Sequence, residues 1–162
     1  MLRNMDAALQ NKLIEYKKKF IKKPGYVVEV GSFDMYGGNH HLFEDADDFC
    51  GIDNHRGPGT DIVADYTEVD RLFDFNPDTL ICLDVFRKGI NPKKLIKALR
   101  ETLIPNGIMV IFIPIENGGS FADAIFSEYE VYDLTTIERT ICGIAKKPYK
   151  IGYDTKRNKR CN

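Results

Sequence analysis

The chain has 162 residues, of which 43% are hydrophobic and 29% charged, and its net charge at neutral pH is −1. This composition is typical of a globular protein, and without repeats, low-complexity segments or linkers it predicts a single domain over residues 1–162. No apolar run is long enough to span a bilayer and the N-terminus lacks the apolar core of a signal peptide, so we predict a cytoplasmic protein.

The first predicted element is an amphipathic helix within the N-terminal segment, residues 1–24. Leu9, Leu13, Tyr16 and Phe20 recur at helical spacing, with lysines at many of the positions between them. Pro24 and the glycine after it end the pattern. Such a helix usually covers a hydrophobic core.

The core, residues 26–145, contains five apolar runs that are typical of β-strands. Helical or loop stretches separate these runs, and this alternation predicts an α/β fold with a mostly parallel sheet and helices on both faces. The five predicted strands are Tyr26–Val30, Phe49–Asp53, Asp61–Ala64, Thr79–Leu83 and Ile108–Pro114.

Two of the stretches between strands have helical patterns. The clearer one covers residues 91–103, where Asn91 is a suitable N-cap and Pro92 fits the first turn. A shorter helix is predicted to begin at Thr67. The side chains expected to face the core from this shorter helix are Val69, Leu72 and Phe73.

Two further segments complete the predicted core. The run "RGPG", Arg56–Gly59, indicates a tight connection in place of a helix. Beyond Pro114 we predict a helix from Phe121 to Tyr129, followed by an antiparallel strand pair, Glu130–Asp133 and Ile137–Ala145.

The four cysteines, Cys50, Cys82, Cys142 and Cys161, include no C-x-x-C pair. This spacing indicates neither a zinc site nor a disulfide framework. We therefore predict no metal site and expect the first three as buried thiols. Cys82 lies inside an apolar run, which favours core packing over a nucleophilic role.

The turn after the first strand, "VVEVGSFDMYGG", resembles a nucleotide-binding loop with two glycines missing. Gly31 is followed by Phe33 and Tyr36 where the G-x-G-x-x-G fingerprint has glycines. Bulky side chains at these positions would crowd a pyrophosphate, which disfavours NAD and FAD, and the sequence has no P-loop motif.

Three aspartates end successive predicted strands. Asp53 stands 22 residues after Gly31, near the spacing at which a carboxylate binds ribose hydroxyls, and Asp65 and Asp84 end the third and fourth strands. Any one of them alone would be read as a turn or helix-cap residue. Three together, beside a glycine turn, favour a site for a ligand with a ribose and positive charge but no phosphate.

These motifs resemble those of class I S-adenosylmethionine-dependent methyltransferases. "VVEVGSFDMYGG" is similar to the family's first motif in the subgroup with a Glu-x-Gly-Ser core, and "FCGIDNHRGPGTDIVAD" to its second and third strands. "LIKALRETLIPNGIMVIFIP" resembles its helix and fifth strand. The resemblance implies a three-layer, Rossmann-like, seven-stranded sheet with an antiparallel C-terminal hairpin.

The resemblance also implies S-adenosylmethionine as cofactor, with S-adenosylhomocysteine as product, and it assigns residues to the methionine part. Glu29 and the backbone of Gly31 and Ser32 would border this part of the cofactor. Leu83 and Asp84 would flank its amino-acid end.

The nucleoside half is assigned in the same way. Asp53 would bind the ribose, and Asp65 with Tyr66 would contact the adenine edge. Phe33 is tolerable beside the cofactor because no phosphate has to pass it, and Asn54 is the remaining residue that we place in the cofactor site.

The sequence indicates the activity of the protein less clearly than its fold. The segment "LDVFRKG" after the fourth strand offers no general base, and the region after Pro114 is too short for a substrate cap. The catalytic residues and the methyl acceptor thus stay unassigned. We keep as the alternative a non-catalytic methyltransferase-like module or partner subunit, and as a distant third an NAD-binding oxidoreductase.

The histidines have two interpretations each. His40 and His41 could act as ligands or bases, but their surroundings favour a solvated helix start. His55 follows Asp53 closely, so it either flanks the cofactor or is an ordinary loop residue.

Charge is segregated along the chain. Residues 1–24 carry a net +5 and the tail, residues 146–162, a net +6, so the remainder carries −12. Lysines on a surface helix and a solvated tail would explain either end alone. Together with Tyr149 and Tyr153, which could stack on bases, the basic ends predict a polyanionic partner, nucleic acid or acidic glycan.

Overall fold

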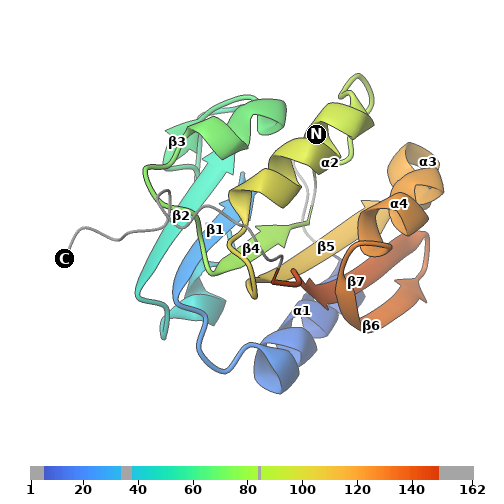
Figure 1. Ribbon diagram of the computed structural model, residues 1–162, viewed down its shortest axis with the longest axis horizontal. Helices are drawn as coiled ribbons and strands as arrows, with labels where there is room; N and C mark the ends of the chain where they lie inside the picture. The colour runs from blue at the N-terminus through green and yellow to red at the C-terminus, as the bar shows by residue number, and fades with distance from the viewer. Residues whose placement is uncertain (1–5, 34–37, 84, 150–162) are drawn as a thin grey trace.

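The computed structural model describes residues 6–33, 38–83 and 85–149, which form a seven-stranded sheet between two layers of helices (Figure 1). The strand order is β3-β2-β1-β4-β5-β7-β6. All pairs among β1 to β5 are parallel, whereas β7 is antiparallel to both β5 and β6. The predicted fold class is therefore confirmed. The strands are β1 Tyr26–Val30, β2 Asp48–Asp53, β3 Ile62–Val63, β4 Thr79–Cys82, β5 Ile108–Pro114, β6 Glu130–Ile137 and β7 Thr140–Lys146.

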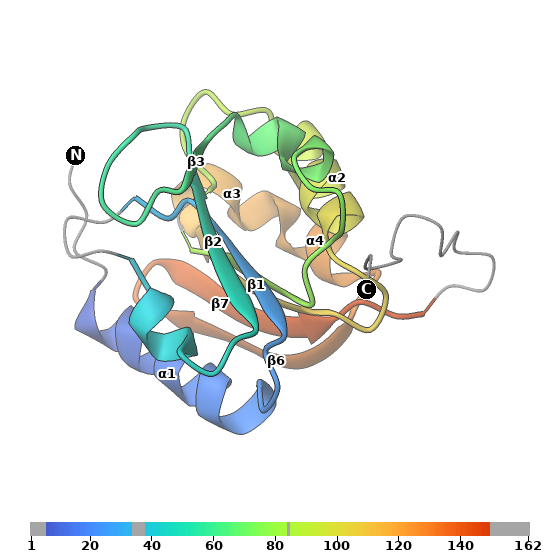
Figure 2. The ribbon, with the colours of Figure 1, turned by 90° about the vertical axis from the view of Figure 1, so that its left-hand side faces the viewer.

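Helices cover both faces of the sheet (Figure 2). The helix α1 lies with the 3₁₀ helix η1 on one face, and α2, α3 and α4 lie with η2 on the other. Because side chains alternate along a strand, Val27 points to the first face, and Val28 and Val30 point to the second. The helical elements are α1 Ala7–Phe20, η1 His40–Phe43, η2 Tyr66–Arg71, α2 Pro92–Thr102, α3 Ile115–Gly118, η3 Gly119–Phe121 and α4 Ala122–Phe126.

The strands β1 and β5 and the helix α2 match the prediction best. The strands β1 and β5 have the predicted bounds, and α2 begins after an N-cap in which Asn91 accepts from the backbone N–H of Lys94. The predicted connection Arg56–Gly59 contains no helix, as expected. It folds back over β2, where the carbonyl oxygen of Gly59 lies only 2.0 Å from the point at which a Cβ on Gly51 would stand.

Two local predictions were wrong. The short helix predicted from Thr67 is present as the 3₁₀ helix η2 with Val69 buried, but Leu72 after it is 36% exposed rather than buried. The second strand of the final pair starts at Thr140, because the chain turns at Glu138 with a left-handed φ of 53°. Ile137 therefore ends β6 instead of opening β7.

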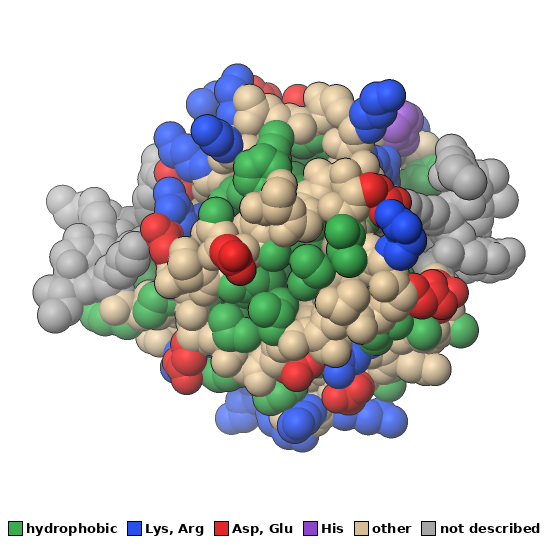
Figure 3. Space-filling model, turned by 90° about the vertical axis from the view of Figure 1, so that its right-hand side faces the viewer, with side chains coloured by type: hydrophobic (Ala, Val, Ile, Leu, Met, Phe, Trp, Pro, Cys, Tyr) green, Lys and Arg blue, Asp and Glu red, His purple; other side chains and the backbone are tan. Residues whose placement is uncertain are grey.

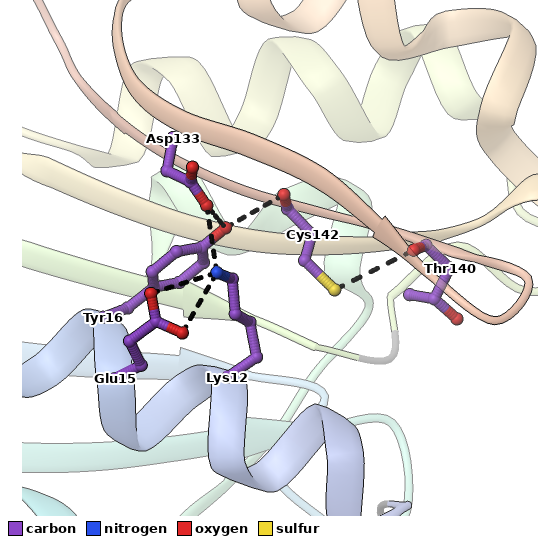
Figure 4. Close-up of polar contacts among 6 residues, drawn as sticks. All are labelled: Lys12, Glu15, Tyr16, Asp133, Thr140 and Cys142. Carbon is purple, nitrogen blue, oxygen red and sulfur yellow. Dashed lines mark hydrogen bonds and ion pairs between the residues drawn. The ribbon is translucent and has the colours of Figure 1, made fainter.

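A polar network attaches α1 to the final hairpin (Figure 4). The hydroxyl of Tyr16, a fully buried residue, lies 2.8 Å from Asp133 Oδ2 and 3.0 Å from the carbonyl oxygen of Cys142. Lys12 Nζ lies 3.2 Å from the same Asp133 oxygen and also bonds Glu15. These contacts fix the orientation of α1 on the sheet, beyond its apolar packing.

The face shown in Figure 3 has hydrophobic side chains gathered at its surface. On the elements of that side, Ile115 is 45%, Val131 41% and Leu134 48% exposed. The last two belong to β6, which forms one edge of the sheet. Among the described residues, no helix has the length and apolar character needed to cross a bilayer.

Candidate functional site

The turn after β1 lies at the point where the strand order reverses. β1 is flanked by β2 on one side and β4 on the other, so the chain leaves the carboxyl end of β1 between two crossovers of opposite direction. Gly31 has a left-handed φ of 81°, which favours glycine. The backbone N–H groups of Gly31 and Ser32 both donate to the carbonyl of Ile52, at 2.8 and 3.1 Å, which ties the turn to β2. Open α/β sheets bind their ligands at such a position.

Asp53, the last residue of β2, is fully buried beside this turn. Its Oδ2 accepts from the backbone N–H of Phe33 (3.1 Å) and from the hydroxyl of Tyr66 (2.9 Å). Its Oδ1 accepts from the backbone N–H of His55 (3.0 Å). A carboxylate can be buried at little cost when donors reach both of its oxygens, as they do here.

Arg87 completes the cluster around Asp53. Its Nη2 lies 3.9 Å from Asp53 Oδ2, and its guanidinium stands 5.7 Å from the centroid of the Tyr66 ring. The Tyr66 hydroxyl also lies 3.4 Å from Asn54 Oδ1. Burial raises the pKa of Tyr66 above its ordinary value, against the opposing effect of the Arg87 charge, so the phenol is neutral and donates. We name Asp53, Tyr66 and Arg87 the Asp53 cluster.

The sequence interpretation missed Arg87. It noted only that the segment after the fourth strand offers no general base. The signal that would have identified Arg87 is topological: the loop after β4 borders the β1 turn in this strand order, so a long cation there can reach the end of β2.

Glu29 points to the η1 face of the sheet and is 2% exposed. It accepts from the backbone N–H of Asn39 (3.3 Å) and from the Asn39 side-chain amide (2.6 Å). Two hydroxyls on this side, Ser32 Oγ and Thr60 Oγ1, are buried without a hydrogen-bond partner among the described residues. A pocket of about 250 Å³ opens here, lined by Glu29, His40, Phe49, Gly59, Thr60 and Asp61.

Asp65 is the N-cap of η2. Its Oδ1 accepts from the backbone N–H and the hydroxyl of Thr67, both at 2.8 Å, and these bonds lower the pKa of Asp65. The helix-cap interpretation thus holds for this aspartate, whose second oxygen is not used in these bonds. Leu83 follows β4 and is half-buried, whereas Asp84 lies outside the described residues.

The predicted residues divide into two groups. Phe33, Asp53, Asn54 and Tyr66 are joined by the hydrogen bonds around the end of β2. Glu29 is bonded separately, to Asn39 on the η1 face. Tyr66 comes next to Asp65 in the chain, but its hydroxyl is directed to Asp53.

The remaining candidate residues, His40, His55 and Cys82, make contacts that are typical of structural residues. His40 is exposed and stacks on Phe49, with ring centroids 4.8 Å apart. His55 has a side chain that is 69% exposed, with Nδ1 3.5 Å from Asp53 Oδ1. Burial raises the pKa of Cys82, which is fully buried, as expected for a core thiol. No group of three or more metal-binding side chains occurs within the described parts of the chain.

No family model matches this sequence. No curated protein matches it either.

Solved structures do match its fold. The N-methyltransferase NodS from Bradyrhizobium japonicum WM9, in complex with S-adenosyl-L-homocysteine, gives a TM-score of 0.67 at 10% identity, covering 88% of this chain and 87% of that chain. The precorrin-6y C5,15-methyltransferase from Geobacter metallireducens GS-15 gives 0.62 at 11%, covering 91% and 94%. The ribosomal protein L11 methylase from Lactobacillus delbrueckii subsp. bulgaricus gives 0.63 at 15%, covering 92% and 82%. The chain therefore has the Rossmann-like fold of the class I S-adenosylmethionine-dependent methyltransferases.

Proposed function

We propose that the protein is a methyltransferase that uses S-adenosylmethionine to methylate an acceptor still to be identified. The observation that carries this proposal is the pairing of a glycine turn after β1 with a carboxylate, Asp53, at the end of β2, in a sheet with the methyltransferase strand order. Fold alone does not decide function, so the site has to support it.

The residues around the turn fit this cofactor. The left-handed Gly31 lets the backbone approach a ligand closely, and Ser32 has a buried hydroxyl with no hydrogen-bond partner in the described part of the chain. Asp53 with Asn54 would hold the ribose, Phe33 would contact the nucleoside, and Asp65 would accept from the adenine amino group through its second oxygen.

The other end of the cofactor is assigned by the same proposal. Glu29 and the Gly31 and Ser32 backbone would border the methionine part, with Leu83 and Asp84 at its amino-acid end. When bound, the cofactor supplies an electrophilic methyl group on a sulfonium. The chain would orient the acceptor against this group, and alignment alone supplies much of the rate when no general base acts.

The names of the three structural neighbours describe different acceptors: a nitrogen atom, precorrin-6y and ribosomal protein L11. The shared fold therefore leaves the acceptor of this chain open.

Isothermal titration calorimetry with S-adenosylmethionine and S-adenosylhomocysteine tests the proposal directly. We expect saturable binding of both ligands and a rise in the unfolding temperature that grows with ligand concentration. NAD is the control and should produce neither effect. Absence of heat and of a thermal shift at millimolar ligand would reject cofactor binding.

The second candidate is a non-catalytic methyltransferase-like module that acts as a partner subunit. Two observations favour it: Asp53 is already satisfied by donors of its own chain, and the edge strand β6 exposes Val131 and Leu134. Exposed apolar edges are typical of surfaces that contact another protein. Binding without methyl transfer to any tested acceptor, or no binding at all, would favour this candidate.

We further propose a cytoplasmic location and a polyanionic partner. The three described cysteines, Cys50, Cys82 and Cys142, are free thiols, which fits a reducing compartment. The polyanion proposal rests on the basic ends of the chain.

A further inference from the structure

The carboxylate of Asp53 has donors of two kinds. The backbone N–H groups of Phe33 and His55 are fixed by the main chain. The hydroxyl of Tyr66, at 2.9 Å, is a side-chain donor to Oδ2, and the guanidinium of Arg87 lies 3.9 Å from the same oxygen as an ion pair. At Oδ1 the exposed His55 side chain lies 3.5 Å away. These side-chain groups, unlike the backbone donors, can leave the carboxylate without a change in the backbone.

A ribose would compete with these side chains. Its vicinal diol needs carboxylate oxygens as acceptors, yet the Asp53 side chain has no solvent-exposed surface. Because Tyr66 and Arg87 both lie at Oδ2, at least one of them has to withdraw before a diol can bind both oxygens.

The surroundings provide a route for this withdrawal. Arg87 lies in the loop between β4 and α2 with its side chain 31% exposed, so it can turn into solvent without disturbing the core. The ring of Tyr66 is only 1% exposed and stays fixed, but Asn54 Oδ1 lies 3.4 Å from its hydroxyl. Rotation of the hydroxyl would transfer its hydrogen bond from Asp53 to Asn54.

We propose that Tyr66 and Arg87 form a latch on Asp53 that opens when the cofactor ribose binds, so that the opening lowers the affinity for the cofactor. This inference rests on the proposed function, because it takes Asp53 as the ribose carboxylate. A protein whose competent form is only partly populated binds with an affinity reduced by that fraction.

The test is the affinity for S-adenosylhomocysteine of Tyr66→Phe and of Arg87→Gln, measured by calorimetry. Tyr66→Phe keeps the buried ring and removes only the competing hydroxyl, so Asp53 gains a partner when the ribose arrives. We expect this variant to bind about tenfold more tightly than the wild type, the scale of one hydrogen bond to a charged group. Arg87→Gln removes the charge at a half-exposed position and should also bind more tightly.

Tyr16→Phe is the matched control. It likewise removes a buried hydroxyl, which lies 2.8 Å from the carboxylate of Asp133, but in the network that holds α1. We expect it to lower the unfolding temperature and leave the affinity for S-adenosylhomocysteine unchanged. Circular dichroism verifies that all three variants are folded.

The outcomes separate the latch from the proposed function. Tighter binding by Tyr66→Phe or Arg87→Gln, or binding by them when the wild type shows none, supports the latch. If the wild type binds and both variants bind equally or more weakly, the latch is overturned and the proposed function stands. If neither the wild type nor any variant binds, both are overturned.

Discussion

Asp53 is the residue on which the cofactor proposal depends most. Replacing it with alanine removes the ribose acceptor and leaves the donors of Phe33, His55 and Tyr66 without their partner. We expect Asp53→Ala to weaken S-adenosylmethionine binding by about 1–3 kcal/mol, and Asp53→Asn to retain part of it through its amide oxygen. Calorimetry measures both affinities.

Because Asp53 is buried, its loss should also destabilise the protein, so thermal unfolding has to accompany each titration. Asp45→Ala is a suitable control, since Asp45, which follows η1 in the chain, is an exposed carboxylate paired with Lys17 of α1. A folded Asp53→Ala variant with wild-type affinity would show that the ribose site is misplaced.

For single residues, the sequence predicted where a side chain lies in the fold better than it predicted the groups to which that side chain bonds. The place of Asp53 at the end of a strand followed from one apolar run and the spacing from Gly31. Its bond with Tyr66 and its proximity to Arg87 depend on how η2 and the β4 loop fold against the sheet, which a linear pattern does not encode. Asp65 taken alone was read as a turn or cap residue and, together with the other two strand-end aspartates, as a ligand residue; its bonds with Thr67 are those of a cap.

At the scale of the elements, the attachment of α1 to the final hairpin includes a titratable carboxylate, Asp133. Burial alone would raise the pKa of Asp133, but the hydrogen bonds from Tyr16 and Lys12 outweigh it and lower that pKa. A carboxylate with a depressed pKa stabilises the fold above its unfolded pKa, and this contribution is lost as pH falls through the folded value.

The expected result is a loss of stability below about pH 4, to which Asp133 contributes about 1 kcal/mol at most, because its side chain is 36% exposed and therefore screened. Chemical denaturation of the wild type and of Asp133→Asn at pH 7 and pH 3 measures this contribution. The variant should be less stable at pH 7 and should lose less stability on acidification. An equal loss in both proteins would contradict the role given to Asp133.

The elements also show why some bounds could be predicted and others could not. β1 and β5 consist mostly of apolar residues and are buried on both faces, so their pattern alone locates them. β3 has only two residues, and the connection before it lies close over β2 at Gly51 and Gly59, a tertiary contact that the linear pattern does not show. The left-handed turn at Glu138 gave no signal, since glutamate is rare in that conformation.

In the molecule as a whole, some basic residues near the ends of the chain form ion pairs with acidic residues of the body. Lys12 pairs with Asp133 (3.2 Å), and Lys146 with Glu130 (3.7 Å). The basic ends are thus partly neutralised by the acidic body, a consequence of folding that net charges per segment do not reveal. Fewer lysines are left for a partner than the sequence alone suggests.

Lys18, Lys22 and Lys23 are exposed at the end of α1, and they give the polyanion proposal its test. We expect RNA or heparin to bind at low ionic strength, with an affinity that falls steeply as salt rises, because contacts with phosphate or sulfate groups release condensed counterions. Replacing the three lysines with glutamine should weaken this binding and reduce its salt dependence. Deleting residues 153–162 should weaken it too, and neither change should alter the affinity for S-adenosylhomocysteine, because the proposed cofactor residues lie elsewhere in the chain.

Filter binding across a salt series measures the affinity for RNA or heparin and its salt dependence. Failure of the wild type to retain RNA, DNA or heparin at low salt would end the proposal and leave a small molecule or a protein side chain as the acceptor to be sought.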